Sequence, residues 1–388
     1  MKRFVYADNA ATTATDKRVV EAMLPYFTEN FGNPSSVHAA GRAVAEAVKS
    51  ARIDISHVLN CRPDEVYFTS GGTEADNWVI KGCVARAIMQ HKTPHIISTV
   101  FEHHAVLHTL EKCGAEVTLL PVYENGIVHP DDLRRAMKEN TVLVTVMFAN
   151  NEIGTIQPIK ELAAIAHEGG AVFHTDAVQA VGHLPIDVKE LGIDALSFSA
   201  HKFGGPKGIG GLYLRNGVRL PNLLSGGQQE RGRRSGTENT PGIIGTAKAL
   251  TLAAEEMQEN IAKVTKLRDK LIDGMLQIPY ARLNGDREQR LPGNVNISIP
   301  FIEGESLLLW LDVEGICASS GSACTSASLD PSHVLLSIGL PHEIAHGSLR
   351  FSLSHENTEE DIDYILEKLP PIVEKLRNMS PLWHEREQ

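Results

Sequence analysis

Seven short apolar runs between residues 66 and 214 constrain the fold of this chain most strongly. Most of them lack polar alternation, and helical or loop segments separate most of them. Strands of this kind suit a sheet whose two faces are covered by crossover helices. The runs are Val66–Thr69, His95–Thr99, Val117–Val122, Val142–Phe148, Ala171–Thr175, Leu196–Ser199 and Leu212–Leu214. The pattern predicts an α/β fold with a seven-stranded, mainly parallel sheet.

A smaller α+β domain is expected after the sheet, because 388 residues exceed one ordinary core. A helical pattern from Gly242 to about Met275 is too long for one compact layer, so the domain boundary is placed within it, near residue 257. Further helices are predicted at Val37–Leu59, Ser306–Leu311 and Glu359–Leu376, and strands at Asn294–Ile299 and Ser348–Leu353. The predicted large domain is 15–257, and the predicted small domain combines 1–14 with 258–388.

Composition narrows the classes of function. The formal net charge of −11 is spread without a basic block, which disfavours stable nucleic-acid binding. The sequence contains no signal peptide and no apolar run of membrane-spanning length, so no membrane partner is expected. The five cysteines are odd in number and form no C-x-x-C pair, which argues against a disulfide framework or a structural zinc site. We therefore expect a cytoplasmic protein with reduced thiols.

Polar side chains gather directly after the predicted strands. SGGTEADN follows the first strand, FEHHAV the second, ANNEIG the fourth, HTDAVQ the fifth and SAHK the sixth. In parallel sheets, ligands bind beyond the carboxyl ends of the strands. Five strand ends are therefore expected to meet at one site.

Lys202 stands at the end of the sixth strand. Ser199 and His201 precede it, and five glycines lie between Gly204 and Gly211. Glycines let the backbone approach a ligand closely. A lysine whose pKa can be lowered is what Schiff-base chemistry needs, although a solvated surface lysine would show the same local pattern.

Asp176 and Gln179 close the fifth strand. A buried aspartate is costly unless a cation faces it, and a protonated pyridine nitrogen is a suitable cation. The alternative is that Asp176 caps the following helix. Together with Lys202 one strand later, Asp176 indicates pyridoxal 5'-phosphate, which needs a lysine imine and a carboxylate at its ring nitrogen.

Gly71, Gly72 and Thr73 lie between a strand and a predicted helix. Backbone N–H groups and the helix dipole make such a turn a phosphate cradle. The Walker spacing is absent. An ordinary threonine cap is the alternative.

His103 and His104 follow the second strand. A histidine at this position can lie over a cofactor ring or transfer protons near neutral pH. His104 and His108 also have a spacing that zinc ligands on a helix can show. No third ligand is near them in the sequence, so no metal is predicted.

Cys324 and Arg350 are the candidate reactive groups of the small domain. Cys324 lies within CASSGSACTSAS, a stretch that has little to bury and is expected to be mobile and exposed. Cys324 is therefore a candidate nucleophile. The planar guanidinium of Arg350, in SLRFSL, can bind a carboxylate through two hydrogen bonds, so Arg350 is a candidate carboxylate ligand. The alternative is an ordinary surface arginine.

With these motifs assembled, the chain resembles the fold-type I pyridoxal-phosphate enzymes of the class-V aminotransferase family. More closely, it is similar to the class I cysteine desulfurases of the NifS/IscS type. The matching segments are YADNAATT, GNPSSVH, FTSGGTEADN, EHHAV, NNEIGTIQP, HTDAVQA, SAHKFGGPKGIG, QERGRRSGTENT, SSGSACTSAS and SLRFSL. They occur in order over nearly the whole chain.

The resemblance implies a role for each site residue. Lys202 would bind the cofactor covalently, with His103 over the ring and Asp176 at the pyridine nitrogen. Gln179 and Asn151 would lie near the phenolic oxygen and the substrate, and Arg350 would bind the substrate carboxylate. The implied phosphate ligands are Gly72, Thr73, Ser199 and His201, joined by Thr237 from the second subunit of a homodimer. Cys324 would accept sulfur.

The implied reaction is the removal of sulfur from L-cysteine, which leaves L-alanine and a persulfide on Cys324. The implied acceptor is an iron–sulfur scaffold, general or dedicated to nitrogenase, or a thiolation enzyme. SPLWHEREQ begins like the family's scaffold-docking tail but stops after few residues, so an altered scaffold contact is expected. One alternative is an aminotransferase or β-lyase of the same fold, and another is a catalytically silent scaffold for sulfur transfer.

Overall fold

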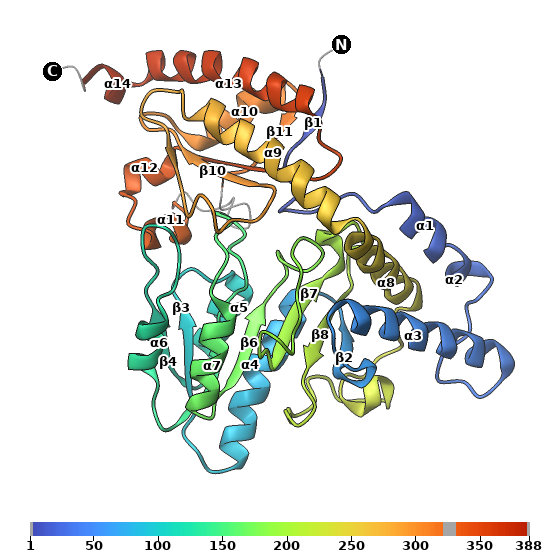
Figure 1. The fold of residues 1–388 in the computed structure, drawn as a ribbon. Helices are drawn as coiled ribbons and strands as arrows, with labels where there is room; N and C mark the ends of the chain where they lie inside the picture. The colour runs from blue at the N-terminus through green and yellow to red at the C-terminus, as the bar shows by residue number, and fades with distance from the viewer. Residues whose placement is uncertain (1–2, 321–330, 386–388) are drawn as a thin grey trace.

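The computed structural model describes residues 3–320 and 331–385, and one large sheet forms its centre (Figure 1). The strands follow one another across this sheet in the order β2, β8, β7, β6, β5, β3 and β4. Their bounds are β2 Val66–Thr69, β3 His95–Thr99, β4 Glu116–Leu120, β5 Thr141–Thr145, β6 Val172–Asp176, β7 Ala195–Ser199 and β8 Gly210–Leu214. The predicted seven-stranded sheet is therefore confirmed, with strand ends displaced by a few residues.

The direction of the strands places most carboxyl ends at one edge. β8 is antiparallel to both of its neighbours, β2 and β7, whereas the other four neighbouring pairs are parallel. The connection between β7 and β8 is too short for a crossover helix, so the chain turns back on itself there. Since two reversals restore the direction, β2 points the same way as β7.

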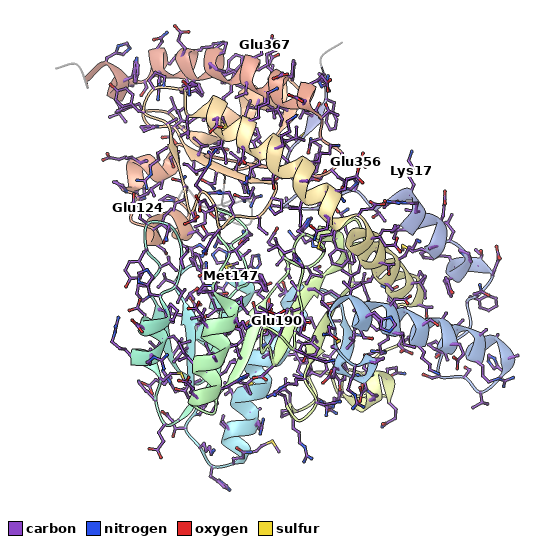
Figure 2. All side chains as sticks on the ribbon, in the orientation of Figure 1. Lys17, Glu124, Met147, Glu190, Glu356 and Glu367 are labelled. Carbon is purple, nitrogen blue, oxygen red and sulfur yellow. The ribbon has the colours of Figure 1, made fainter. Side chains whose placement is uncertain are left out.

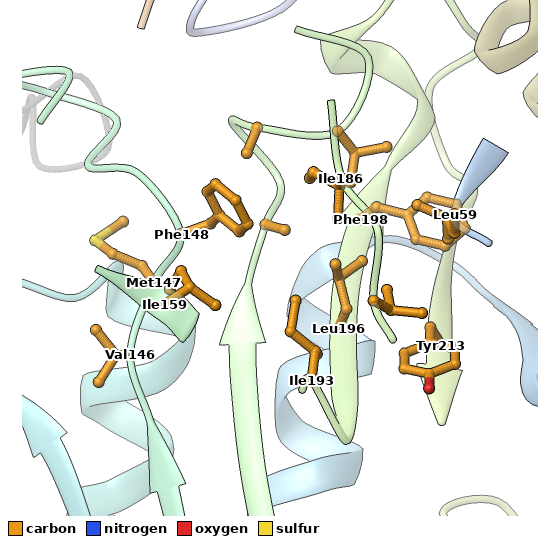
Figure 3. Packing of buried hydrophobic residues seen from close by; sticks show 14 of the residues in the cluster. Leu59, Val146, Met147, Phe148, Ile159, Ile186, Ile193, Leu196, Phe198 and Tyr213 are labelled. Atoms are coloured by element: carbon orange, nitrogen blue, oxygen red, sulfur yellow. The ribbon is translucent and has the colours of Figure 1, made fainter. Parts of the chain in front are cut away.

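Both faces of the sheet are buried, which explains the apolar runs without alternation. Successive residues of a strand point to opposite faces. Ile96 and Leu143 accordingly belong to one apolar cluster, and their neighbours Ile97 and Val144 belong to another. Figure 3 shows part of the second cluster, including Phe198 of β7.

The helices of residues 17–255 lie around this sheet, although the short helix at 25–28 buries none of its residues. They are α1 Lys17–Met23, α2 Pro25–Thr28, α3 Ala39–Val58, α4 Gly72–Met89, α5 His104–Lys112, α6 Pro130–Ala136, α7 Ile159–Glu168 and α8 Thr240–Glu255, with the 3₁₀ turns η1 Pro63–Glu65, η2 Ala200–Lys202 and η3 Gln229–Gly232. In α3, the buried residues Val44, Val48, Ala51 and Ile55 recur at helical spacing. The predicted helix Val37–Leu59 is thus present with slightly shorter bounds.

Most of the remaining elements surround a separate apolar cluster, whereas the two short helices at 333–337 and 342–346 bury Val334, Leu335 and Ala345 in the cluster on the large sheet. Two small sheets contribute to the separate cluster, one in the order β12, β10, β9 and one in which β1 and β11 are parallel. The strands are β1 Val5–Tyr6, β9 Arg282–Leu283, β10 Asn294–Ser298, β11 Ile316–Cys317 and β12 Ser348–Ser352, and the helices are α9 Met257–Met275, α10 Gly304–Val313, α11 His333–Ser337, α12 His342–His346, α13 Glu359–Met379 and α14 Pro381–Glu385. Val5 and Ala7 bury their side chains in this cluster, so both ends of the chain contribute to it.

The helical pattern predicted from Gly242 to about Met275 is present as two helices. α8 ends at Glu255 and α9 begins at Met257, with Glu256 between them at ψ 0°. Leu250 of α8 packs into the cluster on the large sheet, whereas Leu271 of α9 packs into the cluster of the small sheets. The break lets each helix bury its apolar face in a different core. The predicted domain boundary near residue 257 coincides with this break and stays a prediction.

Charged side chains lie mainly at the surface. Of the residues labelled in Figure 2, Glu124, Glu356 and Glu367 have exposed side chains, whereas Met147 is buried. Over the described ranges, no helix combines the length and the apolar character needed to cross a bilayer.

Phe351 should contribute strongly to the stability of the small-sheet core. It is fully buried in β12, so Phe351→Ala should lower the free energy of unfolding by about 3–5 kcal/mol through lost burial and a residual cavity. Denaturant unfolding monitored by circular dichroism measures this. Phe4→Ala is the matched control, since Phe4 is 73% exposed and its removal should change stability by only about 0.5 kcal/mol. Equal effects of the two substitutions would contradict the assignment of this core.

Candidate active site

Five predicted strand ends meet at the carboxyl edge of the large sheet. Asp176 is the last residue of β6 and Ser199 the last of β7. β6 and β7 are parallel neighbours, so these two residues end at the same edge. Lys202 follows in η2, and α4 begins at Gly72 shortly after β2. The fold therefore places Asp176, Ser199, Lys202 and Gly72 at one edge of the sheet.

Lys202 is held by the N-terminal segment of the chain. Its Nζ donates to the carbonyl oxygens of Ala10 at 2.5 Å and Ala11 at 3.0 Å. Gln179 Nε2 also donates to Ala10 O, at 3.0 Å, which brings Gln179 to the lysine. His183 Nε2 donates to the backbone oxygen of Lys202 at 2.8 Å. Nothing in the sequence of the YADNAATT motif indicated that it holds the lysine.

Asp176 is a buried carboxyl. Its Oδ1 accepts from Val178 N at 2.9 Å, so it caps a turn, whereas the alternative reading expected it to cap a helix. Burial raises the pKa of Asp176 to about 6, against the opposing effects of that backbone bond and of the Lys202 charge. A carboxyl that is buried in this way is stabilised in its charged form when a cationic group lies next to it.

A second buried carboxyl, Asp76, lies close to Asp176. Burial, reinforced by the charge of Asp176, raises the pKa of Asp76 well above its ordinary value. His174 Nε2 is 3.6 Å from Asp76 Oδ1, and burial lowers the pKa of His174 to about 3, so this histidine is neutral. Asp76 Oδ1 has no hydrogen-bond partner among the described residues. The two aspartates therefore resist carrying a negative charge at the same time unless a cation is added.

His103 is neutral and its tautomer follows from its hydrogen bond. It is the N-cap of α5, and its Nδ1 accepts from Ala105 N at 3.0 Å. The ring proton therefore resides on Nε2. Burial, followed by the Lys202 charge, lowers the pKa of His103 to about 4.

Three other imidazoles, those of His104, His108 and His333, lie near His103. The His104 ring centroid is 4.8 Å from that of His108 and 4.8 Å from that of His333. His333 was not singled out in the sequence, because it is remote from the other two along the chain. Within residues 3–320 and 331–385, no group of His, Cys, Asp or Glu is arranged to hold a metal ion.

The turn between β2 and α4 has the form of an anion cradle. Gly71 is the N-cap of α4, and no side chain in the described chain caps its first turn. Thr73 lies inside the helix, so the threonine-cap alternative is wrong. A Cβ at Gly72 would come within 2.4 Å of Val178 Cγ2, so only glycine fits there. The unpaired N–H groups of such a turn suit a phosphate.

Ser199 and His201 border this turn. Ser199 Oγ is 3.8 Å from the position that a Cβ on Gly71 would take. His201 Nδ1 and Thr12 Oγ1 are 3.1 Å apart. Burial, followed by the Lys202 charge, lowers the pKa of His201 to about 4, so this ring is a neutral hydrogen-bonding group.

Thr237 lies in a separate cavity of its own chain. This cavity has a volume of about 200 Å³, and its wall includes Thr69, Ser70 and Arg234 together with Thr237. Gly72, Thr73, Ser199 and His201 are not among its lining residues. The contacts of a single chain thus do not join Thr237 to the other predicted phosphate ligands.

Arg350 is buried, so the alternative of a surface arginine is wrong. Its Nη1 donates to Asn151 O at 3.0 Å, and its Nη2 donates to Asp8 Oδ1 at 3.0 Å. Its side chain is only 3% exposed, and its Nε has no acceptor in the part of the chain that the structure describes. A buried donor without an acceptor fits a site that receives an anion. Asp8 was not predicted as a site residue.

Cys324 lies outside the described residues, which resume at Pro331. Two acidic residues that were not singled out contact the chain just beyond it. Ser332 Oγ donates to Glu152 Oε2, and His333 Nε2 donates to Glu102 O at 3.0 Å. Burial raises the pKa of Glu152 to about 7 and that of Glu102 to about 8. Both glutamates lie in polar stretches that follow predicted strands. A carboxylate directly after a buried strand is therefore the sequence signal that could have identified them.

Comparison with known proteins gives a consistent result. The family model described as aminotransferase class-V matches residues 5–365. A cysteine desulfurase IscS of Methanosarcina thermophila is 59% identical over 97% of this chain and 94% of its own length. A cysteine desulfurase IscS of Clostridium botulinum is 58% identical over 99% of this chain and 98% of its own. Among solved structures, a NifS-like protein is 40% identical with a TM-score of 0.90, covering 97% of this chain and all of its own.

Glu102 should make the stability of the cofactor-free chain depend on pH. Its folded pKa of about 8 exceeds the ordinary 4.5, so the folded chain holds this proton more tightly, and stability falls as pH rises from about 4.5 to 8. Glu102→Gln removes the titratable carboxyl, so the loss of stability between pH 5 and 8 should be smaller by roughly 2–4 kcal/mol. Denaturant unfolding at each pH measures it. Glu46→Gln, at a side chain 75% exposed, is the control and should follow the parent chain. Parallel pH profiles of Glu102→Gln and parent would contradict the assignment.

Proposed function

The chain belongs to the aminotransferase class-V family and is a pyridoxal 5'-phosphate-dependent cysteine desulfurase, and on this basis we propose which residues carry the reaction. The observation that carries the assignment is the position of Lys202. Its amine lies at the carboxyl edge of the sheet, close enough for its charge to influence the pKa values of both Asp176 and His103. The relatives do not support the alternatives of an aminotransferase, a β-lyase or a silent scaffold.

The residues of the site fit pyridoxal phosphate. We assign the covalent attachment to Lys202 and the pairing with the ring nitrogen to Asp176, whose burial calls for a cation. His103 is assigned to the ring face, and Gln179 and Asn151 to the phenolic oxygen. When bound, the cofactor supplies an electron sink that acidifies the Cα proton of the attached amino acid. The phosphate is assigned to Gly72, Thr73, Ser199 and His201, and to Thr237 of the partner subunit.

Three groups of the chain then handle the substrate. The Lys202 amine removes the Cα proton, and the carbonyls of Ala10 and Ala11 orient that amine. The guanidinium of Arg350 binds the carboxylate of L-cysteine, for which its Nε is available. His103 is neutral and carries its proton on Nε2, so it can donate a hydrogen bond there, but it can deliver a proton only after it has taken one up.

The Cys324 thiolate attacks the sulfur of the substrate. The new bond joins the two sulfur atoms, the carbon–sulfur bond of the substrate breaks, and its electron pair returns to carbon, which is protonated to give L-alanine. The products are one alanine and one Cys324 persulfide for each L-cysteine consumed. We propose that an iron–sulfur scaffold or another sulfur acceptor takes the sulfur from this persulfide.

We propose that the enzyme is a homodimer. Thr237 lies in its own cavity within one chain, which supports a role in the partner's phosphate site. Leu24, Phe27, Phe31 and Val37 are 56%, 60%, 73% and 88% exposed, and apolar residues gathered along one segment are typical of an interface.

We further propose that the enzyme works in the cytoplasm. Cys61, Cys83, Cys113 and Cys317 are free thiols in the structure, which suits a reducing compartment.

Substitution of the sulfur acceptor tests the proposed chemistry. Cys324→Ser should abolish formation of alanine and persulfide from L-cysteine, because a hydroxyl cannot take over the sulfur. The visible absorbance of the bound cofactor should stay unchanged, since Lys202 and Asp176 are intact. Alanine is measured along with sulfide, because a strong reductant can release sulfide by side routes. Parent-like alanine formation by Cys324→Ser, or labelled sulfur mapped to another cysteine, would contradict the role of Cys324.

Arg350 should control the binding of substrate. Arg350→Lys keeps the charge but loses the planar fork, so KM for L-cysteine should rise about tenfold or more, with a smaller change in kcat. Steady-state alanine formation measures both constants. Arg377→Lys is the matched control, because Arg377 is also buried and donates to the carbonyl oxygen of Pro279. An unchanged KM in Arg350→Lys would contradict the assignment of Arg350 to the substrate carboxylate.

A further inference from the structure

The segment from Gln229 to Asn239, here called the Thr237 segment, begins with an unusual backbone. Glu230, Arg231 and Gly232 have φ values of 46°, 59° and 73° in succession. Residues with a Cβ rarely adopt this left-handed conformation, and two of them in sequence persist only where other contacts hold them. The contacts of Glu230 provide such a hold.

The carboxylate of Glu230 is almost fully buried and is bound from two elements. It accepts from Arg52 Nη2 at 2.7 Å and from Arg52 Nη1 at 2.9 Å, and its side chain is 3% exposed. It also accepts from Phe68 N at 3.1 Å. Arg52 belongs to α3 and Phe68 to β2, so a single carboxylate fastens the Thr237 segment to a helix and to the sheet.

These bonds occupy the outer edge of β2. In the strand order, β2 is terminal and pairs with β8 on its inner side. On the outer side, Phe68 N donates to Glu230, and Val66 O accepts from Arg52 Nη1 at 2.6 Å and from Arg231 Nη2 at 3.0 Å. The segment thus satisfies edge groups that would otherwise pair with another strand.

A second ion pair fastens the same segment to the phosphate turn of its own chain. Arg234 Nε is 2.7 Å from Glu74 Oε1, and Arg234 Nη2 is 3.1 Å from Glu74 Oε2. Glu74 follows Thr73 in the first turn of α4 and also accepts from Ser70 N at 2.9 Å. The segment therefore has a fixed position relative to the start of α4.

Further bonds continue toward Thr237. Ser235 Oγ donates to Gly227 O at 2.7 Å, and Gly236 N donates to the side chain of Gln229 at 3.2 Å. The residues directly before Thr237 are thus tied back to the start of the segment, which Glu230 fixes.

We propose that Glu230 is a positioning residue that sets the place from which Thr237 contacts the cofactor phosphate in the partner subunit. The inference depends on the proposed assignment of Thr237 as a phosphate ligand across the interface. Glu230 acts through the backbone of the Thr237 segment and does not itself touch the cofactor. Its loss should therefore weaken recognition of the phosphate and leave recognition of the aldehyde and ring unchanged.

Two related aldehydes test this role. Pyridoxal phosphate and pyridoxal both react with the Lys202 amine, but only the first carries a phosphate. In cofactor-free full-length protein, Glu230→Gln should weaken binding of pyridoxal phosphate about tenfold or more and leave binding of pyridoxal unchanged. Thr237→Ala should show the same selective loss, and the double variant should lose nothing further, because both substitutions remove one contact. Absorbance titration of each variant gives the dissociation constants.

Asp194→Asn is the matched control. It removes the charge of a different buried carboxylate, which pairs with the half-exposed Arg215 at 2.6 Å, and should show no selectivity between the two aldehydes. If Glu230→Gln does not fold, Arg52→Lys replaces it, and a smaller loss with the same selectivity is expected.

Equal weakening of both aldehydes, or multiplied losses in the double variant, would overturn the positioning role. Parent-like binding in Glu230→Gln with a loss in Thr237→Ala would overturn this inference alone. Parent-like binding in Thr237→Ala would overturn both the assignment of Thr237 and the inference that rests on it.

Discussion

The burial of carboxyl groups at the carboxyl edge of the large sheet is the constraint on which the site depends. Asp76, Asp176 and Glu102 are all at most 6% exposed there, and burial raises the pKa of each. The nearby His103 and His174 are held neutral and cannot balance them. The protonated ring nitrogen of a cofactor bound at Asp176 would offset the free-energy cost of these buried carboxyl groups. The fold therefore favours a cofactor with a cationic ring nitrogen. Lys202 contacts the backbone carbonyls of Ala10 and Ala11, which orient its amine.

The N-terminal segment joins the two ends of the site. Asp8 binds the Arg350 guanidinium, and two residues later the Ala10 carbonyl accepts from both Lys202 and Gln179. The guanidinium proposed to bind the substrate carboxylate and the amine proposed to remove the proton are thereby set at a fixed separation by a few residues of backbone. A rigid backbone that fixes this separation holds the reacting atoms in the geometry that the reaction requires.

The large sheet and the gathering of polar residues at its carboxyl edge could be predicted from the sequence, because buried parallel strands leave a continuous apolar signal and polar residues follow directly after it. The break at Glu256 could not, because the apolar spacing continues across it while the two helices face different cores. Asp8 and the carbonyls of Ala10 and Ala11 were missed for another reason. Backbone acceptors carry no sequence signature, and the partner of Asp8 is 342 residues away in the chain. Cys324 was predicted from the composition of its stretch and from the family resemblance, and it lies outside the described residues.

The way the first residues are bound has a consequence for biosynthesis. β1 pairs with β11, so Val5 lies opposite Ile316, and Asn9 N donates to Ser352 O at 3.1 Å. The ribosome makes this segment before it makes β11 and β12, to which the segment binds. The sheet around Lys202 can fold while the chain is still growing, but the acceptors of its amine can be locked in place only after β12 is made. A growing chain that lacks β12 thus cannot complete the contacts that hold the Lys202 amine in place.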